Sequence, residues 1–449
     1  MADENIDVIN APKTEANMFT FVALASLFFM WGFITVLNDL LIPAFKASFD
    51  LTYTQASLVQ FCFFGAYFIV SPLADLVVKK MGYQMGIVAG LLTTAGGALL
   101  FFPAASANQY VLFLGALAVL AGGITILQVA ANPYVAALGS EQTAAVRLTA
   151  VQTCNSLGVT IAPLLLAGLI IGSVADVQTP YLMMAGVLVA AAVFFRTTTL
   201  PTLSDLEGEV DQDQSLWTSL RVHLGFSALI ILAMIADQLF VASMLVLVAF
   251  GSRLYAMRQY RSMIFGALAI FLYVGGEVSI GSWLVNYFAE EAIGGLDETV
   301  AGQMLGLYWG AAFIGRIVGS IAMNFVEAKK YLAGSALLAV VMILISVNSS
   351  GELAMYSIIA VGFFNSIMFP TIFTMAVKGL GPLTSTGSGL VCQGIVGGAL
   401  VTVLQAAAAD SIGIQASFLV PMLCYIYIGW YALRGSVGSL DSETESKTI

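Results

Sequence analysis

The stretch FFMWGFITVLNDLLIPAF, residues 28–45, decides how the rest of the chain is interpreted. It lies inside an apolar run that begins near Met18 and exceeds the roughly 20 residues that a helix needs to cross a bilayer. This run carries a carboxylate, Asp39, next to Asn38. A charge inside a spanning helix costs at least about 2.5 kcal/mol, so such residues usually face a cavity or a partner. We interpret Asp39 as facing a polar pathway shared with other helices. The alternative is that it reaches headgroup water near the outer helix end.

The composition is that of a polytopic membrane protein. Of the 449 residues, 59% are hydrophobic and 9% are charged, whereas soluble domains carry about 25% charged residues. The polar, acidic N-terminus and the long first apolar run are not typical of a secretory signal. The net charge is −10 and no basic patch occurs, so no nucleic-acid partner is expected.

Few residues are suited to catalysis or metal binding. The four cysteines lie in apolar runs, which is typical of small core residues. The single histidine, His223, borders a loop. We therefore expect no enzymatic activity and no cofactor other than a transported cation.

Apolar segments recur in two sets of six. The first set begins near residue 18 and continues at about 54–78, 84–103, 110–138, 146–172 and 180–195. The second set lies at about 263–289, 302–324, 331–348, 352–377, 386–409 and 414–433. This pattern predicts an all-α membrane protein with two six-helix bundles, 1–196 and 263–449, joined by a cytoplasmic linker, 197–262.

The linker contains an additional apolar segment, residues 224–251, with Asp237 and Gln238 at its middle. Two full helical crossings need roughly 40 residues. We therefore predict a short re-entrant or interfacial helical hairpin with its tip at Asp237 and Gln238, packed on the inner side. The alternative is a single extra span, which would invert every later loop.

The distribution of basic residues predicts the orientation. With the N-terminus inside, the cytoplasmic side receives Lys79, Lys80, Arg147, Arg196, Arg316, Lys329, Lys330, Lys378 and Arg434. Acidic residues dominate the opposite loops. This asymmetry indicates a multi-pass protein of the bacterial inner membrane with both termini in the cytoplasm.

The two halves also resemble each other. Gly65-Ala-Tyr-Phe-Ile69 in span two corresponds to Gly310-Ala-Ala-Phe-Ile314 in span eight, and each precedes a pair of lysines. Such repeats are typical of transporters with a site at the bundle interface. Pro133 and Pro370 are expected to bend or unwind spans four and ten.

Polar residues within the spans form the candidate site. The candidate substrate-binding residues are Asn38, Gln60, Gln128, Asn132, Gln152, Asn155, Glu277, Trp283, Asn286, Asn365 and Gln393. Amides donate and accept hydrogen bonds, which suits a neutral polyhydroxyl ligand, and Trp283 is expected to cover the apolar face of a sugar ring. The alternative is that these amides join helices to one another. Asp75 and Arg316 are gate or packing candidates, with Arg316 expected at a cytoplasmic helix end.

Several of these residues lie in motifs that resemble a known family. The motifs are FFMWG from Phe28, LNDL from Leu37, LQVAANPY from Leu127, VQTCNSLG from Val151 and FPTIF from Phe369. In this combination they resemble the fucose–galactose–glucose:cation symporter family of the major facilitator superfamily. The resemblance implies twelve spans in two bundles related by a pseudo-two-fold axis, an inner and an outer gate, and a central sugar site.

The resemblance also implies a branch. The fucose branch has a glutamate at the position of Gln128, and glutamine cannot carry a proton. LQVAANP and the carboxylate Glu277 in span seven are similar to the glucose/galactose branch, whose members are often sodium-coupled. Asp39 and Glu277 are then the candidate cation-coupling residues, and Asp39 is the candidate sodium ligand. Gln128, Gln152 and Asn155 are the amides that the resemblance favours most.

These observations predict a secondary active importer of a glucose- or galactose-like hexose, driven by cotransport of sodium. The alternatives are a proton-coupled fucose or N-acetylglucosamine permease and a passive facilitator. The expected partners are the sugar, the cation and the lipid bilayer, and a monomer is expected.

Overall fold

Within the part of the chain that the structure describes, twelve helical segments are long and apolar enough to cross a membrane, six between Met18 and Thr197 and six between Arg261 and Arg434. They confirm the predicted all-α fold with six spans in each half. The computed structural model describes residues 18–138, 144–170, 177–201, 214–236, 238–256, 258–323, 325–377 and 384–435.

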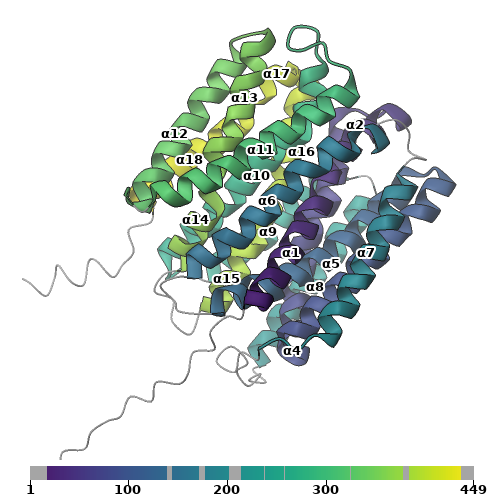
Figure 1. Cartoon of the computed structure of the whole chain (residues 1–449), viewed down its shortest axis with the longest axis vertical. Helices are drawn as coiled ribbons and strands as arrows, with labels where there is room; N and C mark the ends of the chain where they lie inside the picture. The colour runs from purple at the N-terminus through teal and green to yellow at the C-terminus, as the bar shows by residue number, and fades with distance from the viewer. Residues whose placement is uncertain are drawn as a thin grey trace, which may run out of the picture.

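The two halves form two bundles, drawn in purple to blue and in green to yellow in Figure 1. The first contains α1 (Met18–Thr35), α2 (Leu37–Phe49), α3 (Tyr53–Ala56), α4 (Leu58–Ala107), α5 (Tyr110–Ala137), α6 (Ala144–Ile170) and α7 (Gln178–Thr197). The second contains α10 (Arg261–Ala289), α11 (Glu298–Ala322), α12 (Ala328–Val347), α13 (Gly351–Asn365), α14 (Met368–Val377), α15 (Thr384–Gln393), η3 (Gly394–Val396), α16 (Gly397–Ile412), α17 (Ile414–Ser417), α18 (Leu419–Trp430) and η4 (Tyr431–Gly435).

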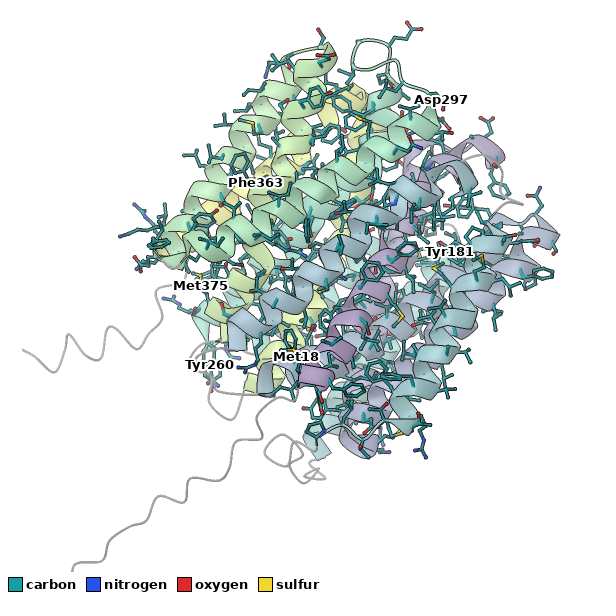
Figure 2. All side chains as sticks on the ribbon, in the orientation of Figure 1. Met18, Tyr181, Tyr260, Asp297, Phe363 and Met375 are labelled. Atoms are coloured by element: carbon teal, nitrogen blue, oxygen red, sulfur yellow. The ribbon has the colours of Figure 1, made fainter. Side chains whose placement is uncertain are left out.

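The bundles meet along a seam where α6 packs against α11 and α4 against α16. Figure 2 labels Asp297 at one end of the molecule and Met18 and Tyr260 at the other. We call these the Asp297 end and the Met18 end.

Span one is interrupted at Val36, between α1 and α2. The break places Asp39 in the first turn of α2. Val36 keeps right-handed helical dihedrals, so the interruption is local and the span continues through it to Phe49.

Spans ten and eleven are also interrupted. Span eleven changes to a 3-10 turn, η3, between α15 and α16. Span ten breaks between Asn365 and Met368, and Pro370 lies in the first turn of α14. Proline is tolerated in a first turn because the missing N–H has no helical partner there. The prediction for Pro370 is thus confirmed, whereas α5 continues as a helix through position 133.

Glycines allow two helix pairs to pack with their backbones in contact. A Cβ atom at Gly158 of α6 would collide with the carbonyl oxygen of Phe29 in α1. A Cβ atom at Gly397 would collide with the carbonyl oxygen of Phe271 in α10. Small residues at such contacts let helices approach closely inside a membrane.

The linker contains two helices, α8 (Gln214–Ile235) and α9 (Leu239–Ala256), joined by a short turn. Two helices instead of one agree with the helical part of the prediction, but they are longer than the predicted segment, and the re-entrant or interfacial placement stays a prediction. The helices continue beyond the apolar segment into the polar residues on both sides, so hydrophobicity alone did not give their ends. Of the predicted tip, Gln238 is exposed, and Asp237 lies outside the described residues.

The hairpin touches both bundles. In α8, the His223 ring lies with Nε2 3.2 Å from the carbonyl oxygen of Ile69 in α4. In α9, the Phe250 ring stacks on Phe271 of α10, with ring centroids 5.6 Å apart. The hairpin therefore lies across the seam.

Candidate functional site

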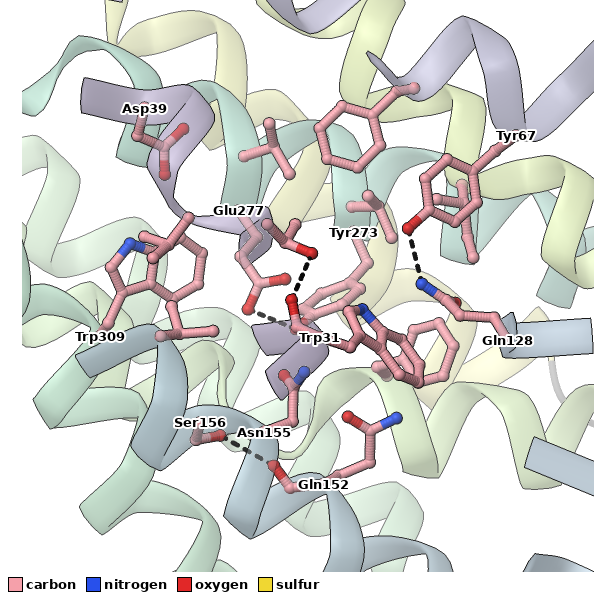
Figure 3. Close-up of a pocket in the computed structure, with 18 of the residues that line it drawn as sticks. Trp31, Asp39, Tyr67, Gln128, Gln152, Asn155, Ser156, Tyr273, Glu277 and Trp309 are labelled. Carbon is pink, nitrogen blue, oxygen red and sulfur yellow. Dashed lines mark hydrogen bonds between the residues drawn. The ribbon is translucent and has the colours of Figure 1, made fainter. Parts of the chain in front are cut away.

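A central cavity of about 140 Å³ lies between the two bundles. Its walls come from α1, α2, α4, α5 and α6 on one side and from α10, α11, α14 and η3 on the other. Figure 3 shows the side chains that converge on it. The lining residues with polar or aromatic side chains are Trp31, Thr35, Asp39, Gln60, Phe64, Tyr67, Gln128, Gln152, Asn155, Ser156, Tyr273, Glu277, Trp309, Arg316 and Phe369.

Asp39 is held by a polar network that crosses the seam. Its Oδ1 accepts a hydrogen bond from Gln60 Nε2 at 2.7 Å and one from Ser282 Oγ at 3.2 Å. Gln60 Nε2 also donates to Ser282 Oγ at 2.9 Å. Asp39 and Gln60 belong to the first bundle, whereas Ser282 is in α10 of the second. Asp39 is 4% exposed, so its carboxylate reaches the cavity and not the headgroup region.

Trp309 lies beside this carboxylate. A Cβ atom at Gly281 would be 3.1 Å from the Trp309 ring and 3.4 Å from Asp39 Oδ2. Gly281 therefore leaves room for both side chains above it. The Trp309 indole N–H is buried and makes no hydrogen bond of standard geometry, but it interacts with the Asp39 carboxylate beside it. It is therefore a donor at the edge of the cavity that faces Asp39.

Glu277, the second carboxylate of the cavity, has its partners within one bundle. Its Oε1 accepts a hydrogen bond from Tyr273 Oη at 2.6 Å, and its backbone carbonyl accepts one from Tyr308 Oη at 3.2 Å. Asn365 Nδ2 in turn donates to Tyr308 Oη at 2.8 Å and to Tyr425 Oη at 3.2 Å. All of these residues belong to the second bundle.

Arg316 corrects a prediction. It was expected at a cytoplasmic helix end, but its side chain is buried and lines the central cavity. Its Nη1 donates to the carbonyl oxygen of Gln152 at 2.9 Å and to Ser156 Oγ, and its Nε donates to the carbonyl oxygen of Ser366 at 3.1 Å. The first two contacts cross the seam, because Gln152 and Ser156 are in α6. The sequence argument failed because Arg316 is followed by six further residues of α11, whose end at Ala322 is closer to the loop.

Three predicted amides besides Gln60 line the cavity. Gln128 Nε2 donates to Tyr67 Oη at 2.6 Å. Asn155 Nδ2 donates to the carbonyl oxygen of Phe28 at 3.1 Å, so this residue also joins α6 to α1. Gln152 and Asn155 line the cavity together, as their spacing of three residues predicts.

Six predicted binding residues do not line this cavity: Asn38, Asn132, Trp283, Asn286, Asn365 and Gln393. The side-chain amides of Asn38 and Gln393 are buried without hydrogen-bond partners. Asn132 is buried next to the cavity-lining part of α5, with its Oδ1 unpaired. Asn365 belongs to the network behind Glu277.

Trp283 and Asn286 follow Glu277 along α10 but lie on other faces of the helix. The Trp283 ring packs edge-on against Tyr53, with ring centroids 5.2 Å apart, so it does not cover the cavity as predicted. Asn286 lines a separate polar pocket with Lys46, Asp50 and Glu298. Neither position is three, four or seven residues from Glu277, which explains why they are not on its face. The remaining gate candidate, Asp75, has a side chain outside the described residues.

The sequence analysis missed the aromatic lining of the cavity. Trp31, Tyr67, Tyr273 and Trp309 all line it. Tyr273 precedes Glu277 by four residues, a spacing that could have identified it. Tyr67 lies within, and Trp309 next to, the motifs that the two halves share. These signals were present but aromatic residues are common in apolar spans.

Comparison with known proteins supports the family resemblance that the sequence motifs indicate. Residues 20–391 match the Major Facilitator Superfamily. The glucose/galactose transporter of Brucella abortus is 46% identical over 93% of this chain and 94% of that protein. The L-fucose-proton symporter of Escherichia coli is 32% identical over 94% of each chain. The crystal structure of FucP in the outward conformation has a TM-score of 0.69 and 32% identity, and the match covers 93% of this chain and 99% of that chain.

The chain is thus a membrane protein of the Major Facilitator Superfamily. Within it, the chain belongs to the fucose–galactose–glucose:cation symporter family, as the motifs predicted.

Proposed function

We propose that this protein is a secondary active importer of a neutral hexose of the glucose or galactose type, driven by a cotransported cation. Residues 1–196 and 263–449 are the two bodies that rock about the central cavity. The names of the relatives from Brucella abortus and Escherichia coli support a sugar as substrate. The observation that carries the proposal is the network of Asp39, which joins a membrane carboxylate to both bundles.

The charges in the cavity favour a cation and a neutral sugar. Asp39, Glu277 and Arg316 are the charged side chains among the described lining residues. Two carboxylates and one guanidinium leave one formal negative charge. An uncompensated charge is expensive inside a membrane, and one monovalent cation would balance it. A neutral polyhydroxyl ligand adds no further charge.

The remaining lining suits sugar hydroxyls and ring faces. Gln60, Gln128, Gln152 and Asn155 supply amides that donate and accept. Trp31 and Trp309 supply indole rings, which replace Trp283 as candidates to cover the apolar face of a pyranose. A site that pairs hydroxyls rejects analogues that lack them, because its buried groups are then left unpaired.

Sodium is the coupling ion of this proposal. Gln128, at the position where the fucose branch carries a glutamate, bonds to Tyr67 and has no proton to release. A proton-coupled fucose permease is the second candidate, because the Escherichia coli relative is named a proton symporter.

Reconstituted transport separates these candidates. Purified protein in proteoliposomes is given radiolabelled glucose, galactose or fucose while the sodium gradient and the pH gradient are varied independently. Accumulation of glucose or galactose that follows the sodium gradient supports the proposal. Accumulation that follows only the pH gradient supports the second candidate, and equilibration without accumulation indicates a facilitator.

The proposal includes a location and an orientation. The Met18 end faces the cytoplasm of a bacterial inner membrane, and the Asp297 end faces outward. Reporter fusions within residues 290–298 should then report an external loop. A cytoplasmic signal from that loop would contradict the orientation.

A further inference from the structure

Asp410 joins the two bundles at the Asp297 end. It lies near the end of α16, in the second bundle. Its Oδ1 accepts a hydrogen bond from the backbone N–H of Tyr53 at 3.1 Å. Its Oδ2 accepts one from the backbone N–H of Thr54 at 3.0 Å and one from Thr54 Oγ1 at 2.5 Å. Tyr53 and Thr54 are in α3, in the first bundle.

These N–H groups have no partner within the first bundle. They belong to the first turn of α3, where backbone donors lack helical acceptors. Thr52 caps this turn from within its own bundle, because its Oγ1 accepts from the N–H of Gln55 at 3.2 Å. The backbone N–H groups of Tyr53 and Thr54, by contrast, donate across the seam to Asp410. Hydrogen bonds to an ionised group are about twice as strong as neutral ones.

A second cross-seam contact lies beside the first. The Tyr53 ring packs edge-on against Trp283 of α10, and Lys46 Nζ lies 4.5 Å from the centroid of the same ring. Tyr53 is thus held to the second bundle through both its backbone and its ring. No lysine or arginine forms an ion pair with Asp410 among the residues described.

We propose that Asp410 is the outer-gate latch of this transporter, bound to α3 when the Asp297 end is closed and released when it opens. The inference rests on the proposed alternating-access function. Opening this end must separate α3 from α16, so the three hydrogen bonds of Asp410 break together. Because they exist in only one of the two states, they favour the closed state, as a population shift requires.

The test measures the two states directly. Spin labels are attached to Gln109→Cys and Ser350→Cys, which are exposed positions of opposite bundles at the Asp297 end, with the four native cysteines replaced by alanine. Pulsed electron paramagnetic resonance in the absence of sugar gives the populations of short and long distances. Asp410→Ala and Asp410→Asn should each raise the ratio of open to closed state, by about tenfold for alanine, which corresponds to about 1.4 kcal/mol.

Asp297→Asn is the matched control. Asp297 is also a carboxylate at this end that caps a helix, because its Oδ1 accepts from the N–H of Thr299 at 2.9 Å. Both groups lie in the second bundle, so this variant should leave the ratio unchanged.

An unchanged distance distribution in the Asp410 variants, or an equal shift in Asp297→Asn, overturns the latch. If Asp410→Ala does not fold, Asp410→Asn carries the test. Since no sugar or ion gradient enters this measurement, a failed sugar-uptake assay with a preserved shift would refute the proposed substrate and coupling and leave the effect of Asp410 on the two conformational states standing.

Discussion

The two carboxylates of the central cavity differ in where their partners lie. Asp39 bonds to Gln60 in its own bundle and to Ser282 in the other. Glu277 accepts a hydrogen bond from Tyr273 in its own helix. Its backbone carbonyl accepts one from Tyr308, which is bonded to Asn365, and both of these residues also belong to the second bundle. In the proposed rocking motion, the hydrogen bond between Asp39 and Ser282 would have to change, whereas the hydrogen-bond partners of Glu277 would move with it.

This difference assigns the two groups different tasks. A ligand shifts a conformational equilibrium only if its affinity differs between the states. A cation at Asp39 would meet different neighbours in the two states, and so can drive the transition. A ligand at Glu277 would keep the same Tyr273 network in both states, and only its contacts with the cavity-lining amides of the first bundle would change. We therefore expect Asp39 to couple the ion to transport and Glu277 to bind.

The largest expected effect is that of Asp39→Asn. One monovalent cation entering down 100 mV contributes about 2.3 kcal/mol, enough for roughly 50-fold accumulation of sugar. Without the carboxylate we expect the accumulation ratio in proteoliposomes to fall to about one, with sugar exchange retained. Asp297→Asn, which removes a carboxylate outside the cavity, should accumulate sugar normally. Accumulation by Asp39→Asn would remove Asp39 from the coupling mechanism.

Glu277→Gln should weaken sugar binding and preserve coupling. Hydrogen bonds to charged groups contribute about 1.5–3 kcal/mol, so the affinity for sugar should fall by about 10- to 100-fold. The number of cations moved per sugar should stay the same, because the partners of Glu277 do not cross the seam. Binding measured by calorimetry and ion-to-sugar flux ratios checks both parts. A changed flux ratio at saturating sugar would erase the distinction between the carboxylates.

Two serines of α10 test whether the hydrogen bond across the seam to Asp39 affects cation binding. Ser282 Oγ donates to Asp39 in the other bundle, whereas Ser279 Oγ donates to Gln405 in its own bundle. Ser282→Ala should change the cation concentration for half-maximal uptake by about 10- to 100-fold, the range for a hydrogen bond to a charged group.

The matched variant, Ser279→Ala, leaves Gln405 with an unpaired buried oxygen. It should lower the melting temperature with little effect on cation dependence. If the two serine variants changed cation dependence equally, the hydrogen bond between Ser282 and Asp39 across the seam would have no specific role in cation binding.

The sequence predicts the two carboxylates of the cavity more reliably than the other site residues. The spans followed from hydrophobicity, and Asp39 and Glu277 were identified because a charge in a span is rare and costly. Arg316 was misplaced because the last turns of α11 are themselves apolar, so nothing in the sequence separated its buried position from a helix end. Gln393 and Asn38 were chosen because amides in spans are uncommon, but residue type does not give the face on which a side chain lies.

The aromatic lining was harder to predict for a related reason. An indole in an apolar span has the same composition signal whether it faces the cavity or the core. Trp283 and Trp309 are both buried, or nearly so, and neither indole N–H makes a hydrogen bond of standard geometry. Only the packing separates them: Trp309 lines the cavity beside Asp39, and Trp283 lies against Tyr53.

The smallest effect that we predict uses this pair. Trp309→Phe keeps a ring over the cavity and removes the indole N–H together with part of the ring volume, so a loss of stability similar to that of Trp283→Phe is expected. Sugar affinity should fall by about 3- to 10-fold if the N–H bonds to a hydroxyl or supports Asp39 in the loaded state, the range for one neutral hydrogen bond. Trp283→Phe removes an indole N–H outside the cavity and should leave affinity unchanged. Equal losses in both variants would mean that the indoles act through packing, and the assignment of Trp309 to the sugar site would be wrong.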